Sequence, residues 1–410
     1  MGDKLKIVQK LDYLGVDYIE AGNPGSNPKD LEFFQKVERM GLRHAKLIAF
    51  GSTRRPNIKV EEDANIKALL TANTSAVAIF GKSWDLHVTD VLRTSLEENL
   101  RMIYDTVSYL KELGKEVVFD AEHFFDGYNA NPDYAMKALE AAAEGGADWL
   151  VLCDTNGGSF PTEVAEITRR VCDEFRIFVG IHCHNDNGMA VANSIMAVEQ
   201  GAVQVQGTFN GYGERCGNAN LSTIIPNLQI KRGMSCIPDD KVKELTSVSR
   251  YISEISNLPH DERQPYVGNS AFAHKGGMHI DAVKKNSSTF EHIPPEAVGN
   301  ERRILMSEMS GRSTILEKIK KVAPWATKES EETKMIIDKL KELEHVGYQF
   351  EGAESSFELM VRRALGKDRK FFEVKDFRVL CEEHWQDDFS ATAMLKVKVD
   401  GIEETVAAEG

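Results

Sequence analysis

Over residues 1–211, short apolar runs alternate with segments of helical spacing. In residues 161–173, for example, Val164, Ile167 and Val171 share one helical face. A first helix is predicted over residues 3–14. Near-continuous apolar strands that alternate with helices are typical of a parallel sheet covered on its faces. The predicted strands are residues 18–22, 44–50, 76–81, 116–122, 148–155, 178–185 and 202–211.

These strands fit two α/β architectures. One is an open, doubly wound sheet, and the other is a (β/α)₈ TIM barrel, which needs eight strands. We favour a barrel that lacks its first strand in this chain, with that strand before Met1. Polar residues follow many different strands, and a barrel brings those carboxyl ends to one mouth. These residues are Glu20, Glu122, Asp154, His182, His184 and Asn210.

The alternation stops near residue 233. Residues 239–257 and 328–345 have helical spacing, and residues 258–315 are rich in loops. After residue 370 the pattern becomes that of β-strands, with a hairpin signal at Asp400-Gly401. We therefore predict a barrel domain at 1–232, a helical and loop-rich linker subdomain at 233–350, and the start of a β-rich domain at 351–410 that continues beyond Gly410.

Composition excludes several classes of function. The net charge of -14 argues against a general nucleic-acid-binding surface. No apolar run approaches the roughly 18 residues of a membrane span, and the first residues do not resemble a signal peptide. The six cysteines are scattered without a Cys-x-x-Cys pair, which is typical of reduced thiols. We expect a cytoplasmic protein without nucleic-acid or membrane partners.

The sharpest local signal is His182-Cys183-His184. Residues i and i+2 of a strand point to the same side, so the two imidazoles project together and form half of a divalent-metal site. The alternative is a pair of hydrogen-bonded core histidines. Asn218, in the next Gly-rich loop, has an amide oxygen that suits the same metal, although an Asn there is also a common turn former.

Two further strand ends carry candidate chemistry. The Thr155 hydroxyl and nearby backbone N–H groups suit a substrate carboxylate, although Asp154-Thr155-Asn156-Gly157 is also an ordinary turn. Asp120 and Glu122 share one face of their strand. A Glu buried in a barrel mouth either carries a proton or orients other groups, and the spacing does not separate these roles.

Several long motifs resemble the isopropylmalate/homocitrate/citramalate synthase family, and they are most similar to its citramalate branch. Residues 180–188 and 211–220 are similar to the second signature and the Gly-Glu-Arg-x-Gly-Asn loop of the family. The resemblance extends along the whole chain, through residues 24–30, 80–87, 120–128, 271–279 and 350–354. The family's first signature, Leu-Arg-Asp-Gly, has no counterpart here and is expected upstream of Lys4.

The resemblance implies a metal-dependent acyltransferase that condenses acetyl-CoA with pyruvate to citramalate and CoA, in isoleucine biosynthesis. The divalent metal (Mg, Mn or Zn) is expected on His182, His184, Asn218 and the upstream Asp. Thr155 is expected to hold the pyruvate carboxylate. Because Asp120 shares the face of Glu122 and is polar, we expect it to oppose the apolar side chains of larger keto acids. Glu122 and His279 are the expected catalytic residues, with His279 supplied across a homodimer. The domain at 351–410 would be regulatory.

Alternative functions follow from the same chemistry. 2-Isopropylmalate and homocitrate synthases differ in the keto acid that they accept. A hydroxymethylglutaryl-CoA lyase fits less well, because that relative lacks a β-rich C-terminal extension. A different class of hypothesis is a catalytically incompetent module that still dimerises, because the Arg and Asp of the first signature are absent.

Cys183 replaces a small residue of the family and should point outward, toward the helices.

Overall fold

A computed structural model describes residues 2–305, 312–350, 353–384 and 388–409. The chain forms two compact units. The first contains residues 1–273 and 287–303, and the second contains residues 274–286 and 304–410. Each unit has its own hydrophobic core.

The first unit contains a seven-stranded sheet in the order β1 to β7, with every neighbouring pair parallel. All seven predicted strands are present, and the first and last are the end strands of the sheet. The strands are β1 (Tyr18–Glu20), β2 (Lys46–Ser52), β3 (Ala76–Lys82), β4 (Glu116–Glu122), β5 (Trp149–Asp154), β6 (Phe178–Cys183) and β7 (Gln204–Gln206).

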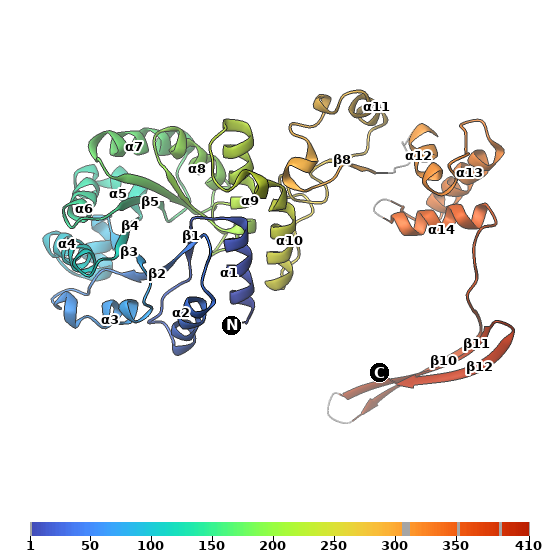
Figure 1. The fold of residues 1–410 in the computed structure, drawn as a ribbon, viewed down its shortest axis with the longest axis horizontal. Coiled ribbons are helices and arrows are strands. Elements are labelled where there is room, and N and C mark those ends of the chain that lie inside the picture. The colour runs from blue at the N-terminus through green and yellow to red at the C-terminus, as the bar shows by residue number, and fades with distance from the viewer. Residues whose placement is uncertain (1, 306–311, 351–352, 385–387, 410) are drawn as a thin grey trace. The chain divides into compact units, whose positions relative to one another are not determined.

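Helices follow the strands and cover the outer face of the sheet (Figure 1). The outward strand residues are apolar, as Ile79, Phe119 and Leu152 show, and they pack against helix residues in one large core. The helices are α1 (Gly2–Leu14), α2 (Pro28–Met40), α3 (Ala64–Thr71), α4 (Leu96–Glu112), α5 (Phe124–Ala130), α6 (Pro132–Glu144), α7 (Pro161–Glu174) and α8 (Ala190–Glu199).

The inner face of the sheet has a separate lining. A small cluster that includes Ile48, Ala78, Val118 and Val151 fills its middle. At the amino-terminal end, the Glu116 carboxylate of β4 accepts hydrogen bonds from Tyr18, Lys46 and Trp149 and so ties β4 to three other strands. The carboxyl-terminal end carries the polar residues described below.

The rest of the first unit packs beside the sheet around a second core. Leu14 of α1 belongs to this core, together with Leu245 and Ile252. The predicted helix over 239–257 consists of a 3₁₀ segment, η5 (Asp239–Glu244), followed by α10 (Leu245–Ile255). The other elements are η1 (Val60–Glu62), η2 (His87–Leu92), η3 (Phe209–Gly211), α9 (Leu221–Pro226), η4 (Asn227–Lys231), η6 (Ser287–Thr289), η7 (Pro295–Val298), and β9 (Arg303–Ile304), which pairs with β8 (Ala273–His274).

The second unit contains helices and a separate antiparallel sheet. Its helices are α11 (Gly277–Lys285), α12 (Arg312–Val322), α13 (Glu331–His345) and α14 (Glu354–Ala364). Ile319, Ile336 and Val361 form the centre of the core of α12, α13 and α14. The sheet consists of β10 (Glu373–His384), β11 (Asp388–Val399) and β12 (Ile402–Glu409). The predicted hairpin turn at Asp400-Gly401 is confirmed, and both residues have the positive φ of such turns.

No helix in the described parts of the chain is long and apolar enough to cross a membrane. The six cysteines are all free thiols, and Cys153 and Cys183 are buried.

Candidate active site at the barrel mouth

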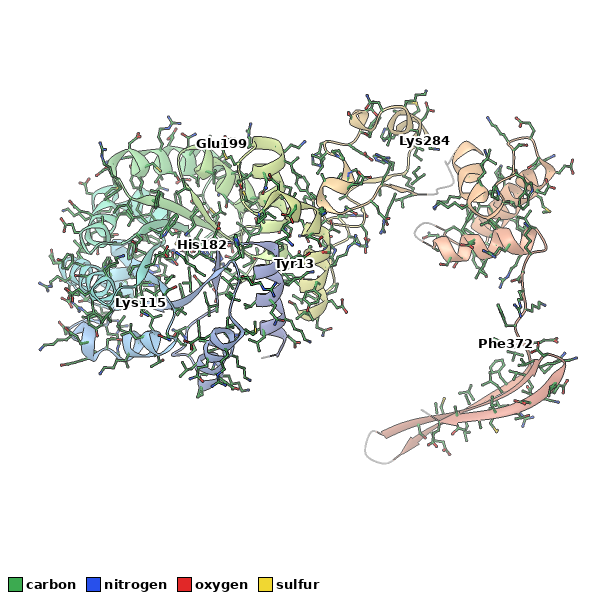
Figure 2. All side chains as sticks on the ribbon, in the orientation of Figure 1. Tyr13, Lys115, His182, Glu199, Lys284 and Phe372 are labelled. Atoms are coloured by element: carbon green, nitrogen blue, oxygen red, sulfur yellow. The ribbon has the colours of Figure 1, made fainter. Side chains whose placement is uncertain are left out.

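His182 and His184 lie at the carboxyl end of β6, where Figure 2 labels His182 among the strands of the first unit. Their ring centroids are 5.2 Å apart, with 36° between the ring planes. Cys183 between them is fully buried in the outer core, which confirms that it points toward the helices. Because side chains alternate along a strand, the two imidazoles face the inner side of the sheet together.

A hydrogen-bonded chain connects His182 to Asp120. Gln206, the register partner of His182 on β7, donates from Nε2 to Asp120 Oδ1 at 3.0 Å. Its Oε1 lies 2.8 Å from His182 Nδ1. Because the amide oxygen can only accept, His182 Nδ1 carries the proton. The lone pair of His182 is therefore on Nε2, the nitrogen that remains available to a ligand.

Asn218 lies opposite His184. The backbone of the loop after β7 pairs with the end of β6 through an isolated antiparallel bridge between these residues. Directly opposed residues of such a pair carry their side chains on one face. The loop folds this tightly because of its glycines: a Cβ on Gly213 would lie 2.1 Å from Asn218 Nδ2, and a Cβ on Gly217 would lie 1.9 Å from the Gly211 carbonyl oxygen.

The donor atoms of this group fit a divalent metal ion. His184 Nδ1 and Asn218 Oδ1 are buried and have no hydrogen-bond partner in the described structure. Burial, with the charges of His182 and Arg215, lowers the pKa of His184 to about 4, so this imidazole is neutral at pH 7 as a metal ligand must be. No set of three or more His, Cys, Asp and Glu side chains among the described residues forms a metal site, so the donors present are two imidazoles and one amide.

Asp120 is buried in an apolar part of the inner wall. It is 4% exposed and pairs in register with Phe80 and Val151. Burial raises the pKa of its carboxyl to about 7. Burial among the strand ends and then repulsion from Asp120 raise the pKa of Glu20 to about 7. These two carboxyl groups therefore resist carrying two negative charges together.

Thr155 lies at the end of β5, next to β4 and β6. Its Oγ1 accepts a hydrogen bond from the His123 backbone N–H at 2.8 Å, which leaves the hydroxyl proton to donate. The Thr155 carbonyl accepts from Arg215 Nη2 at 2.6 Å, and Arg215 also pairs with Asp186 at 2.7 Å. Thr155 is thus held by the loop after β4 and by the loop after β7.

Glu122, at the end of β4, forms an ion pair with Lys82 of β3. Beside this pair, the His87 and His123 rings lie 4.2 Å apart, and Trp84 stacks on His87. Burial and the charge of His123 lower the pKa of His87. The mouth therefore has two polar groups, one around Glu122 and one around His182.

The other predicted catalytic residue, His279, lies on α11 in the second unit, where its side chain is exposed and its ring approaches Gly276. Its role stays a prediction. Three residues at the mouth were not predicted as site residues: Lys82, Gln206 and Arg215. Lys82 had a signal, because it is a polar residue at the inward position that ends an apolar strand.

Comparison with family models gives two matches. Residues 1–252 match the family described as HMGL-like. Residues 266–347 match the family described as homocitrate synthase post-HMGL domain-like. The first match covers the strands and loops that carry Glu122, Thr155, His182, His184 and Asn218.

The chain is also similar to curated proteins along its whole length. It is 54% identical over 410 residues to an (R)-citramalate synthase of Aquifex aeolicus, and 52% identical over 409 residues to one of Geobacter sulfurreducens. Each match covers all of this chain and 78% of the relative. Among solved structures, an HMG-CoA lyase of Bacillus subtilis matches 63% of this chain and 88% of its own, with a TM-score of 0.53 at 18% identity, which supports the TIM-barrel fold.

Proposed function

The chain belongs to the HMGL-like family, together with the (R)-citramalate synthases that match it from end to end, and we propose that it condenses acetyl-CoA with pyruvate to give citramalate and CoA. The observation that carries this proposal is the 54% identity over all 410 residues. The barrel mouth supports it, because it carries a neutral imidazole at His184, a free hydroxyl proton at Thr155 and a Glu122 carboxylate paired with Lys82.

We propose His182, His184 and Asn218 as the protein donors for a divalent ion (Mg, Mn or Zn). When bound, such an ion polarises the keto group of pyruvate and stabilises the charge that develops on its oxygen. Gln206 keeps the His182 proton on Nδ1, and the low pKa of His184 keeps that ring unprotonated. The chain therefore presents the Nε2 atom of His182 and the unprotonated ring of His184.

Thr155 holds pyruvate by donating its hydroxyl proton to the carboxylate. Because its Oγ1 already accepts from the His123 N–H, the hydroxyl proton is directed away from that bond. Asp120 and Phe80 line the adjacent wall, where the methyl group of pyruvate would lie. A larger keto acid would place its apolar side chain against the Asp120 carboxyl, and an apolar group cannot form a hydrogen bond with it.

The reaction requires proton transfer at the acetyl group. His279 and Glu122 supply the acid–base groups: a methyl C–H bond of acetyl-CoA breaks, and the new C–C bond forms to the keto carbon of pyruvate while its oxygen gains a proton. Water then cleaves the thioester to release CoA and citramalate. Because His279 lies in the second unit, this step needs α11 to reach a barrel mouth. We propose that it does so in a cytoplasmic homodimer that serves isoleucine biosynthesis.

Keto-acid preference tests the proposal. CoA release is measured with acetyl-CoA, a divalent metal and each of pyruvate, 2-ketoisovalerate and 2-ketoglutarate. We expect kcat/KM for pyruvate to exceed the others by at least about tenfold, since each added methylene is worth about 1–3 kcal/mol in a fitted pocket. A higher kcat/KM for 2-ketoisovalerate or 2-ketoglutarate would instead indicate an isopropylmalate or homocitrate synthase.

A further inference from the structure

Lys82 and Glu122 form the one inward ion pair at the carboxyl end of the described sheet. They are register partners on β3 and β4, and Lys82 Nζ contacts Glu122 Oε2. Their side chains are only 15% and 25% exposed. An ion pair in this position is desolvated enough to fix geometry, unlike a pair on the surface.

The surroundings hold both partners in place. Ser83 donates from Oγ to the Glu122 carbonyl at 2.7 Å, and Asn99 Nδ2 donates to the Lys82 carbonyl at 2.8 Å. The Lys82 ammonium also lies 5.5 Å from the centre of the Phe80 ring. Glu122 is therefore fixed through both its backbone and its carboxylate. Within the described residues, Oε2 is occupied and Oε1 accepts no hydrogen bond.

The charges at the mouth make this lysine distinctive. Glu20, Asp120 and Glu122 all face inward near the carboxyl end of the sheet. Two lysines, Lys82 and Lys46, are found among the described inward residues of the seven-stranded sheet. Lys46 pairs with Glu116 at the amino-terminal end of the sheet, so Lys82 is the lysine at the carboxyl-terminal end. Without Lys82, Glu122 would lose its cation and face the nearby carboxyl groups, which favours a different side-chain position.

We propose that Lys82 is a positioning residue for the condensation. It binds Oε2 of Glu122 and leaves Oε1 as the open oxygen of a fixed carboxylate beside the acetyl group. Lys82 acts through Glu122 and does not contact the substrates. This inference rests on the proposed function, because it assumes that Glu122 belongs to the catalytic machinery.

A double-mutant cycle tests this inference in the full chain, with Lys82→Met, Glu122→Gln and the double variant. We expect Lys82→Met to lower kcat by about 10- to 100-fold, as misplacement of a catalytic group does, with the KM for pyruvate within about threefold of wild type. Glu122→Gln should lower kcat by about 10²- to 10⁴-fold. If Lys82 acts only through Glu122, the double variant should be no slower than Glu122→Gln.

Two further variants control for folding. Lys82→Arg keeps a cation next to the carboxylate, so its kcat should exceed that of Lys82→Met by about fivefold or more. Lys46→Met removes the matched ion pair at the other end of the sheet and should keep kcat within about twofold of wild type. Multiplicative losses in the double variant would overturn the inference, because they would mean that Lys82 contacts substrate. Wild-type kcat in Lys82→Met would also overturn it.

A crystal structure of Lys82→Met gives a readout that does not depend on activity. The inference predicts that the Glu122 carboxylate leaves its wild-type position or becomes disordered, while the Glu122 backbone stays in place through Ser83. An unmoved carboxylate would overturn the inference. If wild-type protein releases no CoA with pyruvate, the proposed function fails, and this crystallographic result still decides whether Lys82 holds Glu122.

Discussion

Replacing Gln206 with Leu should weaken metal binding without touching a metal ligand. Gln206 accepts from His182 Nδ1 at 2.8 Å and donates to Asp120 Oδ1 at 3.0 Å. Leu is close to Gln in volume, so the substitution removes both hydrogen bonds without opening a large cavity. His182 would then be free to place its proton on either nitrogen and to rotate, so that Nε2 is no longer fixed as the donor.

The size of the effect follows from the contacts that are lost. Residues that orient a metal-binding imidazole typically change metal affinity by about 10- to 100-fold, which is about 1.4–2.7 kcal/mol. The unpaired Nδ1–H and Asp120 carboxyl together should also lower the free energy of unfolding by about 1–3 kcal/mol. Because His182 is half-buried, water can replace part of its hydrogen bond, and we expect the lower half of both ranges.

Isothermal titration of Mn²⁺ into chelator-treated protein measures this effect. Gln204→Leu is the matched control: Gln204 lies two residues earlier on the same strand, and its Oε1 is buried without a hydrogen-bond partner in the described structure. We expect the Kd for Mn²⁺ to rise by at least about tenfold in Gln206→Leu and by less than about threefold in Gln204→Leu. Equal affinities in wild type and Gln206→Leu would refute the assigned His182 tautomer.

Three other substitutions should change the KM for pyruvate, the keto-acid preference and the pH dependence of stability, respectively. Thr155→Val should raise the KM for pyruvate by about tenfold and leave the KM for acetyl-CoA unchanged in steady-state assays, because one hydrogen bond to a carboxylate is lost. Asp120→Ala should raise kcat/KM for 2-ketoisovalerate relative to pyruvate by about tenfold, and an unchanged ratio would exclude Asp120 as a determinant. For Glu98, burial alone would raise the pKa, but hydrogen bonds from Arg54 and its neighbours lower it to about 2. A carboxyl whose pKa is lower in the folded state stabilises the fold at pH values above its unfolded-state pKa, and this stabilisation is lost as the pH falls. In urea unfolding, the free energy of unfolding of wild type minus that of Glu98→Gln should therefore decrease by about 1.4 kcal/mol from pH 6 to pH 3.5.

The sheet was predictable from sequence because its strands are buried on both faces. Continuous apolar runs, such as the one that ends at Glu122, mark each strand without help from distant residues. Strand alternation also gave the direction of Cys183, which packs in the outer core. The pairing of His182 with His184 followed from the same period of two.

The partners of these residues were harder to predict because they depend on register between strands. The contact of Gln206 with His182 and that of Lys82 with Glu122 are fixed by which residues stand level on neighbouring strands. A local pattern does not encode that register. Arg215 reaches Asp186 and Thr155 only because the glycines of its loop allow a tight fold. The role of His279 depends on how two units meet, which no local pattern specifies.

Condensation of acetyl-CoA with [2-¹³C]pyruvate tests the central claim most directly. The protein is incubated with both substrates and Mn²⁺, the labelled carbon is followed by ¹³C NMR, and free CoA is measured with a thiol reagent. The proposed reaction predicts that the labelled ketone carbon becomes a tertiary alcohol carbon bonded to a new CH₂ group, with one CoA released per carbon converted. CoA release without change at the labelled carbon would mean simple thioester hydrolysis and would contradict the proposed function.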